Sequence, residues 1–198
     1  YDIAATTNQK ISVYLNGKKL NINNFKKYIS MYYDEDSVIY ENISDRWQLG
    51  ILYIPDNGYE QISYVNGICT FKGGNHVKYV MDDLIDKLIT ITKKKHKDIK
   101  IKPPQIKENL VIFLNCIVEN PAFTSQTKEE LKNKPNTFGS KCEVPDKIIN
   151  KLIKTGIMEQ VLMYAKLKEE SILKKKTDGK KTGNIKGIPK LEDANWAG

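Results

Sequence analysis

Hydrophobic and polar residues alternate in the stretch KISVYL, residues 10–15. Its apolar side chains would share one face of a β-strand, because successive side chains of a strand point to opposite sides. The dipeptide Asn16-Gly17 follows directly, and Asn-Gly is the preferred pair for a two-residue hairpin turn. The pattern predicts a β-hairpin near the start of the chain.

Further stretches rich in β-branched and aromatic residues predict a sheet. Three of them follow one another: SVIYENI (37–43), RWQLGILYI (46–54) and QISYVNGICT (61–70). The segment PDNG (55–58) separates the second from the third and has the composition of a turn. A fourth strand is predicted in the apolar run from Leu110 to Val118, after a loop at Pro103-Pro104.

Apolar residues at three- and four-residue steps predict the helices. The longest such pattern lies in HVKYVMDDLIDKLITITKKK (76–95), and Asn24 can cap a shorter helix, FKKYISMYY. Pro145 can open a helical stretch that runs through about Lys175, as one or two helices interrupted near Gly156. Strands, a helix, a strand and further helices in this order indicate an α/β or α+β domain.

The amino-acid composition indicates which class of molecule the chain contacts. The net charge is +8 with a sequence pI near 9.2, and Arg46 is the only arginine, so lysine supplies nearly all positive charge. This favours contact with a polyanion through point charges. Three widely spaced cysteines without a CxxC pair argue against a disulfide framework or a zinc knuckle and fit a reducing compartment. No apolar run approaches the roughly 20 residues that cross a bilayer.

The stretch ENPAFTSQTKEEL (119–131) follows the apolar strand and carries a lysine among small hydroxyl residues. Thr127-x-x-Glu130 matches a capping box and predicts a helix that starts close to Lys128. Helix N-termini suit phosphate, and a lysine there adds a full charge. The alternative is a solvated lysine in a surface helix. The stretch has no glycine loop of the Walker type, so any nucleotide must be held mainly by other residues.

A second group of lysines ends the long predicted helix. Lys93, Lys94, Lys95 and Lys97 lie in ITKKKHKDIKIK, where positive charge is favourable at a helix C-terminus anyway. A solvated helix end and a nonspecific phosphate contact are both open on this pattern alone. No aromatic residue is interleaved, so base stacking on single strands is not expected.

GGNH (73–76) precedes the same helix and suggests either a metal site or a close approach of the helix start. A single histidine without a nearby cysteine or second histidine is a poor metal site. Close packing that requires glycine is the better interpretation, and we expect no metal ligands in this chain.

Several longer strings resemble the eukaryotic-type DNA topoisomerase II family: YDIAAT, ISYVNGICTFKGGNHVKYV, NPAFTSQTK, FGSKCE and PKLEDAN. The resemblance spans essentially the whole chain. It implies the end of an ATP-binding domain at 1–8, a transducer domain at 9–176 and, from Thr177, a linker (177–198) into the DNA-cleavage core. It also implies a ribosomal-protein-type two-layer α/β sandwich with a long C-terminal helix, a fold shared with gyrase B.

The resemblance further implies roles for individual residues. Lys128 matches the family's switch lysine, which contacts the γ-phosphate of ATP, and Gln126 matches the glutamine of the same loop. The lysines at 93–95 and Lys97 match a lysine-rich loop that faces duplex DNA. ATP and Mg²⁺ would be held mainly by the upstream domain.

As a whole, the implied parent enzyme is a nuclear, homodimeric, ATP-dependent type II topoisomerase with no membrane partner, and the chain would be an excised, inactive piece of it. Two rivals stay open. One is a stand-alone nucleic-acid-binding module of the same fold. The other is a related ATPase of DNA repair or chaperone function, against which the strings PAFTSQTK and PKLEDAN argue.

Overall fold

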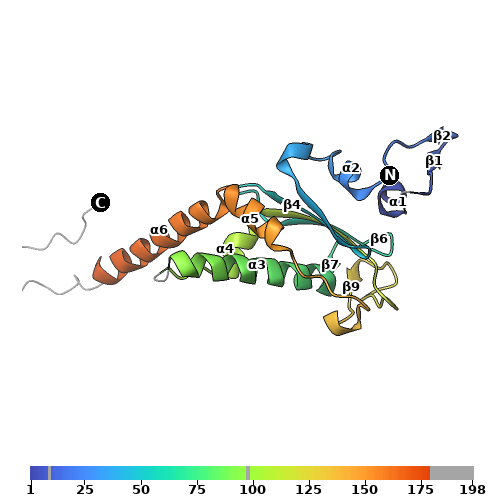
Figure 1. Cartoon of the computed structure of the whole chain (residues 1–198). Helices are drawn as coiled ribbons and strands as arrows, with labels where there is room; N and C mark the ends of the chain where they lie inside the picture. Colours follow the sequence, from blue (N-terminus) through green and yellow to red (C-terminus); the bar gives the residue numbers. More distant parts are fainter. Residues whose placement is uncertain (9, 97–98, 179–198) are drawn as a thin grey trace, which may run out of the picture.

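The computed structural model describes residues 1–8, 10–96 and 99–178 (Figure 1). Its centre is a five-stranded sheet in the order β3-β4-β8-β5-β6. The strands are β3 (Ile39–Ser44), β4 (Trp47–Tyr53), β5 (Glu60–Val65), β6 (Ile68–Cys69) and β8 (Leu110–Cys116). Strand β8 pairs antiparallel with β4 and parallel with β5. A parallel pair needs a crossover, which α3 (Asn75–Lys95) and α4 (Pro103–Lys107) provide.

The large helices cover one face of the sheet. Helices α3 and α5 (Asp146–Lys154) lie along it in Figure 1, and α6 (Ile157–Asp178) begins beside them and extends beyond the sheet. The core beneath them joins alternate residues of the strands to the apolar stripe of α3, which includes Val77, Val80, Leu84 and Leu88. The helical pattern predicted for 76–95 is therefore confirmed. Gly156, with φ 88°, separates α5 from α6, as the interruption expected there requires.

Smaller elements cover part of the opposite face. Helices α1 (Asp2–Thr6) and α2 (Phe25–Ile29) pack there around Tyr64 and Phe113 of the sheet. The Asn24 side chain accepts a hydrogen bond from Lys27 N–H (2.8 Å), so the predicted cap is confirmed. The hairpin β1 (Tyr14–Leu15) and β2 (Lys18–Lys19) forms around Asn16-Gly17 as predicted.

Strand β8 is apolar from Leu110 to Leu114 because both of its faces are buried there. Leu110, Ile112 and Leu114 belong to the core under the large helices, while Val111 and Phe113 belong to the core under α1 and α2. This two-sided burial explains the continuous apolar run LVIFL, which contrasts with the alternating pattern of a half-exposed strand.

Two details of the expected fold are wrong. QISYVNGICT is not one strand but the hairpin β5–β6, turned by Asn66 (φ 52°) and Gly67 (φ 79°). Pro103-Pro104 does not lie in a loop but opens the short helix α4, because proline is preorganised for the first helical turn. The α/β class itself is confirmed. Lys97 and positions 179–198 of the expected linker lie outside the described residues.

Candidate functional site

The stretch around Lys128 forms a β-hairpin, so the predicted helix start is wrong. Phe123 is bridged antiparallel to Leu131, and Thr124 N–H donates to the carbonyl of Glu130 (3.1 Å). Thr127 therefore caps no helix, because Glu130 belongs to strand β9 (Glu130–Leu131). The local capping pattern is overridden by pairing with a distant part of the chain.

A tight turn forms the tip of this hairpin. Lys128 N–H donates to the carbonyl of Ser125 (3.1 Å), and Lys128 adopts φ 59°. A four-residue turn followed by a left-handed residue is a known hairpin closure. The hydroxyls of Ser125 and Thr127 are hydrogen-bonded across the turn at 2.7 Å. We call residues 122–132 the TSQTK hairpin.

The second arm of the TSQTK hairpin is attached to the start of α3. Strand β9 pairs in parallel with β7 (Gly73–Gly74), in the register Gly73↔Glu130 and Gly74↔Leu131. A Cβ on Gly74 would lie 2.5 Å from both the N and the O of Leu131, and its φ is 134°. Only glycine permits this approach. The packing interpretation of the GGNH motif is thus confirmed.

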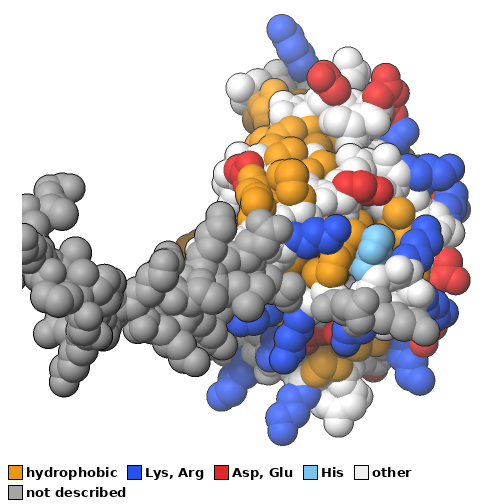
Figure 2. Space-filling model, turned by 90° about the vertical axis from the view of Figure 1, so that its left-hand side faces the viewer, with side chains coloured by type: hydrophobic (Ala, Val, Ile, Leu, Met, Phe, Trp, Pro, Cys, Tyr) orange, Lys and Arg blue, Asp and Glu red, His pale blue; other side chains and the backbone are white. Residues whose placement is uncertain are grey.

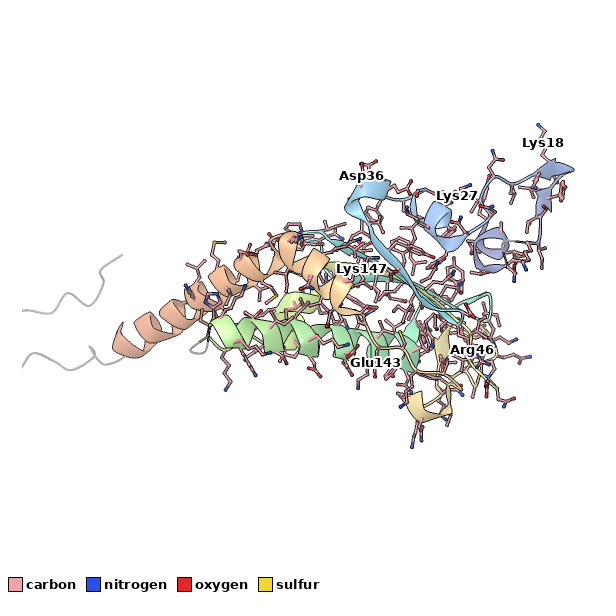
Figure 3. All side chains as sticks on the ribbon, in the orientation of Figure 1. Lys18, Lys27, Asp36, Arg46, Glu143 and Lys147 are labelled. Carbon is pink, nitrogen blue, oxygen red and sulfur yellow. The ribbon has the colours of Figure 1, made fainter. Side chains whose placement is uncertain are left out.

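The first arm is attached to the end of the sheet. Glu119 Oε1 accepts from Arg46 Nη1 (2.7 Å), and Arg46 also donates to the carbonyl of Gly139 (3.3 Å). Trp47 Nε1 donates to Ser140 Oγ (2.8 Å), which fixes the FGS segment beside it. Figure 3 shows Arg46 at the same end of the molecule as β9. The base of the hairpin is therefore connected to both the sheet and the start of α3 by hydrogen bonds.

The side chains of Gln126 and Lys128 are exposed at the tip. Among the described residues, Lys128 has no carboxylate partner within 4 Å, whereas Lys72 pairs with the neighbouring Glu129. The Lys72 ammonium lowers the pKa of the Glu129 carboxyl, with help from the Thr127 hydroxyl. The tip can offer one cation and one amide to an external ligand, but one turn cannot enclose a nucleotide.

Exposed lysines lie at the other end of α3. Lys93, Lys94 and Lys95 form its last turn and have no ion-pair partner in the described part of the chain. In contrast, Lys87 is tied to Asp83 (3.0 Å) and to the carbonyl of Val144 (2.7 Å). Figure 2 views the molecule from this end and shows Lys and Arg side chains gathered on its lower part. This arrangement can bind phosphate groups without base recognition.

His76 is fully buried and takes no part in either site. Its Nε2 lies 3.2 Å from Thr70 Oγ1, and burial lowers its pKa to about 3. Within the described ranges, no cluster of three His, Cys, Asp or Glu side chains could hold a metal ion. Cys116 is buried in the core.

The fold does not bring the tip of the TSQTK hairpin close to the lysines in the last turn of α3. Helix α3 begins at the strand that holds the TSQTK hairpin and ends at the lysines, and its 21 residues span about 31 Å. Sequence analysis missed the two ion pairs beside the hairpin, which are Lys72–Glu129 and Arg46–Glu119. The pair Gly73-Gly74 indicated that another segment packs closely against it. Nothing in the sequence indicated that this segment is β9.

Comparisons with known proteins agree with this fold. A family model described as DNA gyrase B matches residues 11–181. The chain belongs to the DNA gyrase B family. It is 46% identical, over its whole length, to DNA topoisomerase 2 of Drosophila melanogaster, of which it covers 14%. The resemblance to eukaryotic-type DNA topoisomerase II is therefore confirmed, and this gyrase B family chain spans about a seventh of the length of that relative.

Solved structures agree as well. The ATPase region of Saccharomyces cerevisiae topoisomerase II is similar with a TM-score of 0.76 at 43% identity, covering 83% of this chain and 42% of that one. The ATPase and transducer domains of DNA topoisomerase II from Balamuthia mandrillaris give 0.79 at 37% identity, covering 85% and 43%. Among the described helices of this gyrase B family member, none is long and apolar enough to span a membrane.

Proposed function

We propose that this chain is the transducer of an ATP-dependent type II DNA topoisomerase, with Lys128 as its contact to the γ-phosphate of ATP. The observation that carries the proposal is the TSQTK hairpin, which presents the exposed Lys128 at the tip of a turn whose base is hydrogen-bonded to the sheet and to the start of α3. The identity to DNA topoisomerase 2 supports it. The proposed divisions are 1–8 for the end of an ATP-binding domain, 9–176 for the transducer and 177–198 for a linker.

The position of the hairpin suits a nucleotide bound by a preceding domain. In Figure 1 the N-terminus and α1 lie at the same end of the molecule as β7 and β9. Residues Thr6 and Thr7, which end or follow α1, line one hollow together with Arg46, the anchor of the hairpin. An ATP-binding domain joined at this end would meet the tip. That domain would also hold Mg²⁺, for which the described residues of this chain offer no ligand cluster.

Lys128 would stabilise the charge that develops on the γ-phosphate, and Gln126 would position or sense the nucleotide. When the phosphate is lost, the ammonium loses its partner and the hairpin is free to move with the domain to which it is attached. Helix α6 would carry that movement towards the DNA gate of a homodimeric, nuclear parent enzyme. The chain alone would neither hydrolyse ATP nor cleave DNA.

The test is ATP turnover by the parent enzyme with Lys128→Ala. We expect turnover to fall by about a hundredfold, the size of one lost transition-state contact, while ATP still binds. Lys132→Ala is the matched control, because Lys132 is exposed on an arm of the same hairpin but away from its tip. Unchanged turnover for Lys128→Ala would rule out the γ-phosphate contact.

A second candidate function is nonspecific binding of duplex DNA by Lys93, Lys94, Lys95 and Lys97. The exposed last turn of α3 favours it for the first three. In the parent enzyme this contact would couple DNA to ATP hydrolysis. In a stand-alone nucleic-acid-binding module the same lysines would act without any nucleotide, and Lys128→Ala would then be silent.

A further inference from the structure

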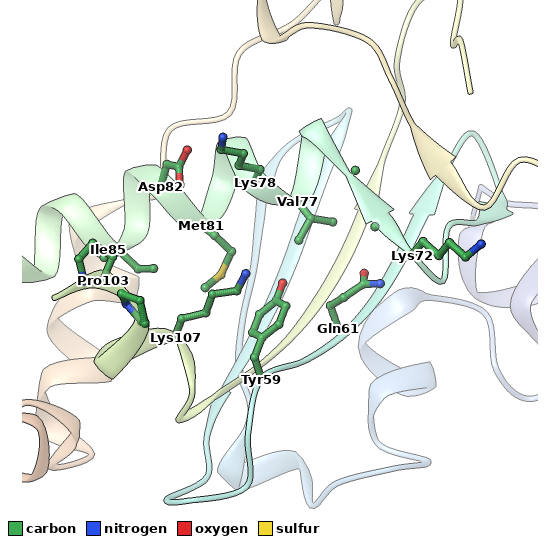
Figure 4. Close-up of a pocket in the computed structure, with 13 residues that line it drawn as sticks. Tyr59, Gln61, Lys72, Val77, Lys78, Met81, Asp82, Ile85, Pro103 and Lys107 are labelled. Carbon is green, nitrogen blue, oxygen red and sulfur yellow. The ribbon is translucent and has the colours of Figure 1, made fainter. Parts of the chain in front are cut away.

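Lys72 makes two separate contacts with Glu129 of the TSQTK hairpin. Its backbone N–H donates to the carbonyl of Glu129 (3.0 Å), and its ammonium pairs with the Glu129 carboxylate. The same ammonium lies 5.6 Å from the centre of the Phe71 ring. Figure 4 shows Lys72 extending away from Tyr59, Met81 and the other side chains that line the neighbouring hollow. The side chain is therefore directed towards the hairpin rather than into that hollow.

Glu129 is the immediate neighbour of Lys128, and this creates a problem for the proposed phosphate contact. A lysine ammonium sits on a flexible four-carbon stem and can turn to a carboxylate next to it. An unpaired Glu129 would compete with the γ-phosphate for that ammonium, and its negative charge would repel the phosphate itself. The carboxylate has to be occupied elsewhere if Lys128 is to stay available.

We propose that Lys72 is a positioning residue for ATP hydrolysis, which binds the Glu129 carboxylate and so keeps the ammonium of Lys128 free. This inference rests on the proposed role of Lys128. The β7–β9 pairing fixes Lys72 and Glu129 next to each other, because Gly73-Gly74 and Glu130-Leu131 directly follow them in register. Lys72, just before the start of α3, thereby neutralises the carboxylate next to the tip of the hairpin.

The test compares Lys72→Met, Glu129→Gln and the double variant in the full parent enzyme, with ATP turnover as the readout. Lys72→Met frees the carboxylate and should lower kcat about two- to fivefold, the range of an exposed ion pair, with little change in KM. Glu129→Gln removes the competitor, so it should leave turnover nearly unchanged. The double variant should regain the turnover that Lys72→Met loses.

Recovery of turnover in the double variant distinguishes two roles of the ion pair: binding the Glu129 carboxylate, and holding the hairpin in place. If the ion pair only tied the hairpin down, Glu129→Gln would be as harmful as Lys72→Met, and the double variant would show no recovery. Either result would overturn the positioning role. The Lys147–Glu41 pair (2.9 Å), on α5 and β3, supplies the control substitutions Lys147→Met and Glu41→Gln.

Turnover of Lys128→Ala, measured in parallel, distinguishes a failure of the proposed γ-phosphate contact from a failure of the proposed role of Lys72. If Lys128→Ala is silent, the γ-phosphate contact is wrong and Lys72 has nothing to position. If Lys128→Ala abolishes turnover while Lys72→Met is not rescued, the γ-phosphate contact stands and only the positioning role falls. Thermal unfolding of each variant shows whether a loss of turnover comes from misfolding.

Discussion

Replacing Gly74 by alanine should either destabilise the fold or detach the TSQTK hairpin from the start of α3. At φ 134° the alanine backbone is strained, which costs about 1–3 kcal/mol. Its Cβ would also lie 2.5 Å from N and O of Leu131, and forcing such a contact costs about another 1–3 kcal/mol. We expect a total of about 2–6 kcal/mol unless β9 detaches and relieves the clash.

Chemical unfolding and amide exchange together distinguish these two responses. If β9 stays in place, the unfolding midpoint falls. If β9 detaches, the midpoint changes little, but Lys72 N–H loses the protection given by its hydrogen bond to Glu129 (3.0 Å). Gly17→Ala is the matched control, because φ is also positive (77°) but nothing lies within 4 Å of its Cβ, so only about 1–2 kcal/mol is expected. A Gly74→Ala variant with unchanged stability and unchanged protection would refute the close approach.

Two further predictions concern pH and DNA. The pKa of His76 is about 3 in the fold and about 6.5 in the unfolded chain. Because the unfolded chain binds more protons between these values, the free energy of unfolding falls as the pH drops below about 6.5. At pH 5 it should be about 2 kcal/mol lower than at pH 8. Urea unfolding of His76→Gln should lack this component, whereas the exposed control His96→Gln should keep it. Changing Lys93, Lys94 and Lys95 to alanine should reduce the log–log salt slope of duplex DNA binding by up to about 3 and weaken DNA stimulation of ATP hydrolysis. The same measurements on Lys18→Ala/Lys19→Ala, on the distant β1–β2 hairpin, should show neither effect, and an unchanged slope in the triple variant would exclude the contact (Figure 3).

Local sequence patterns predicted most of the helices and strands, because the spacing of apolar residues and the turn dipeptides lie within each element itself. The apolar stripe of α3 and the Asn-Gly turn at 16–17 both form where the sequence indicated. The β5–β6 hairpin was missed although Asn66-Gly67 carries the same turn chemistry, because the surrounding residues looked like one continuous strand. In that case the turn dipeptide was the better guide.

The geometry of the candidate site was much less predictable. Thr127-x-x-Glu130 satisfies a helix-capping pattern, but Glu130 pairs with Gly73, which lies 57 positions earlier in the chain. Local sequence contains no information about that partner. The anchors Arg46 and Lys72 escaped notice for the same reason, since an isolated charged residue gives no sign of the carboxylate that it will meet.

The arrangement along α3 connects the two proposed contacts by a physical route. Gly74, the residue directly before the helix, is paired with β9, and the last turn of the helix carries Lys93, Lys94 and Lys95. Between them lies one uninterrupted helix with a buried apolar face, which resists bending far more than a loop would. If DNA on the lysines favours the position of the hairpin in which Lys128 meets phosphate, linkage requires ATP to strengthen DNA binding by the same factor. A soft connection between the two ends could not carry that coupling, whereas a helix that directly follows a residue paired with the hairpin can.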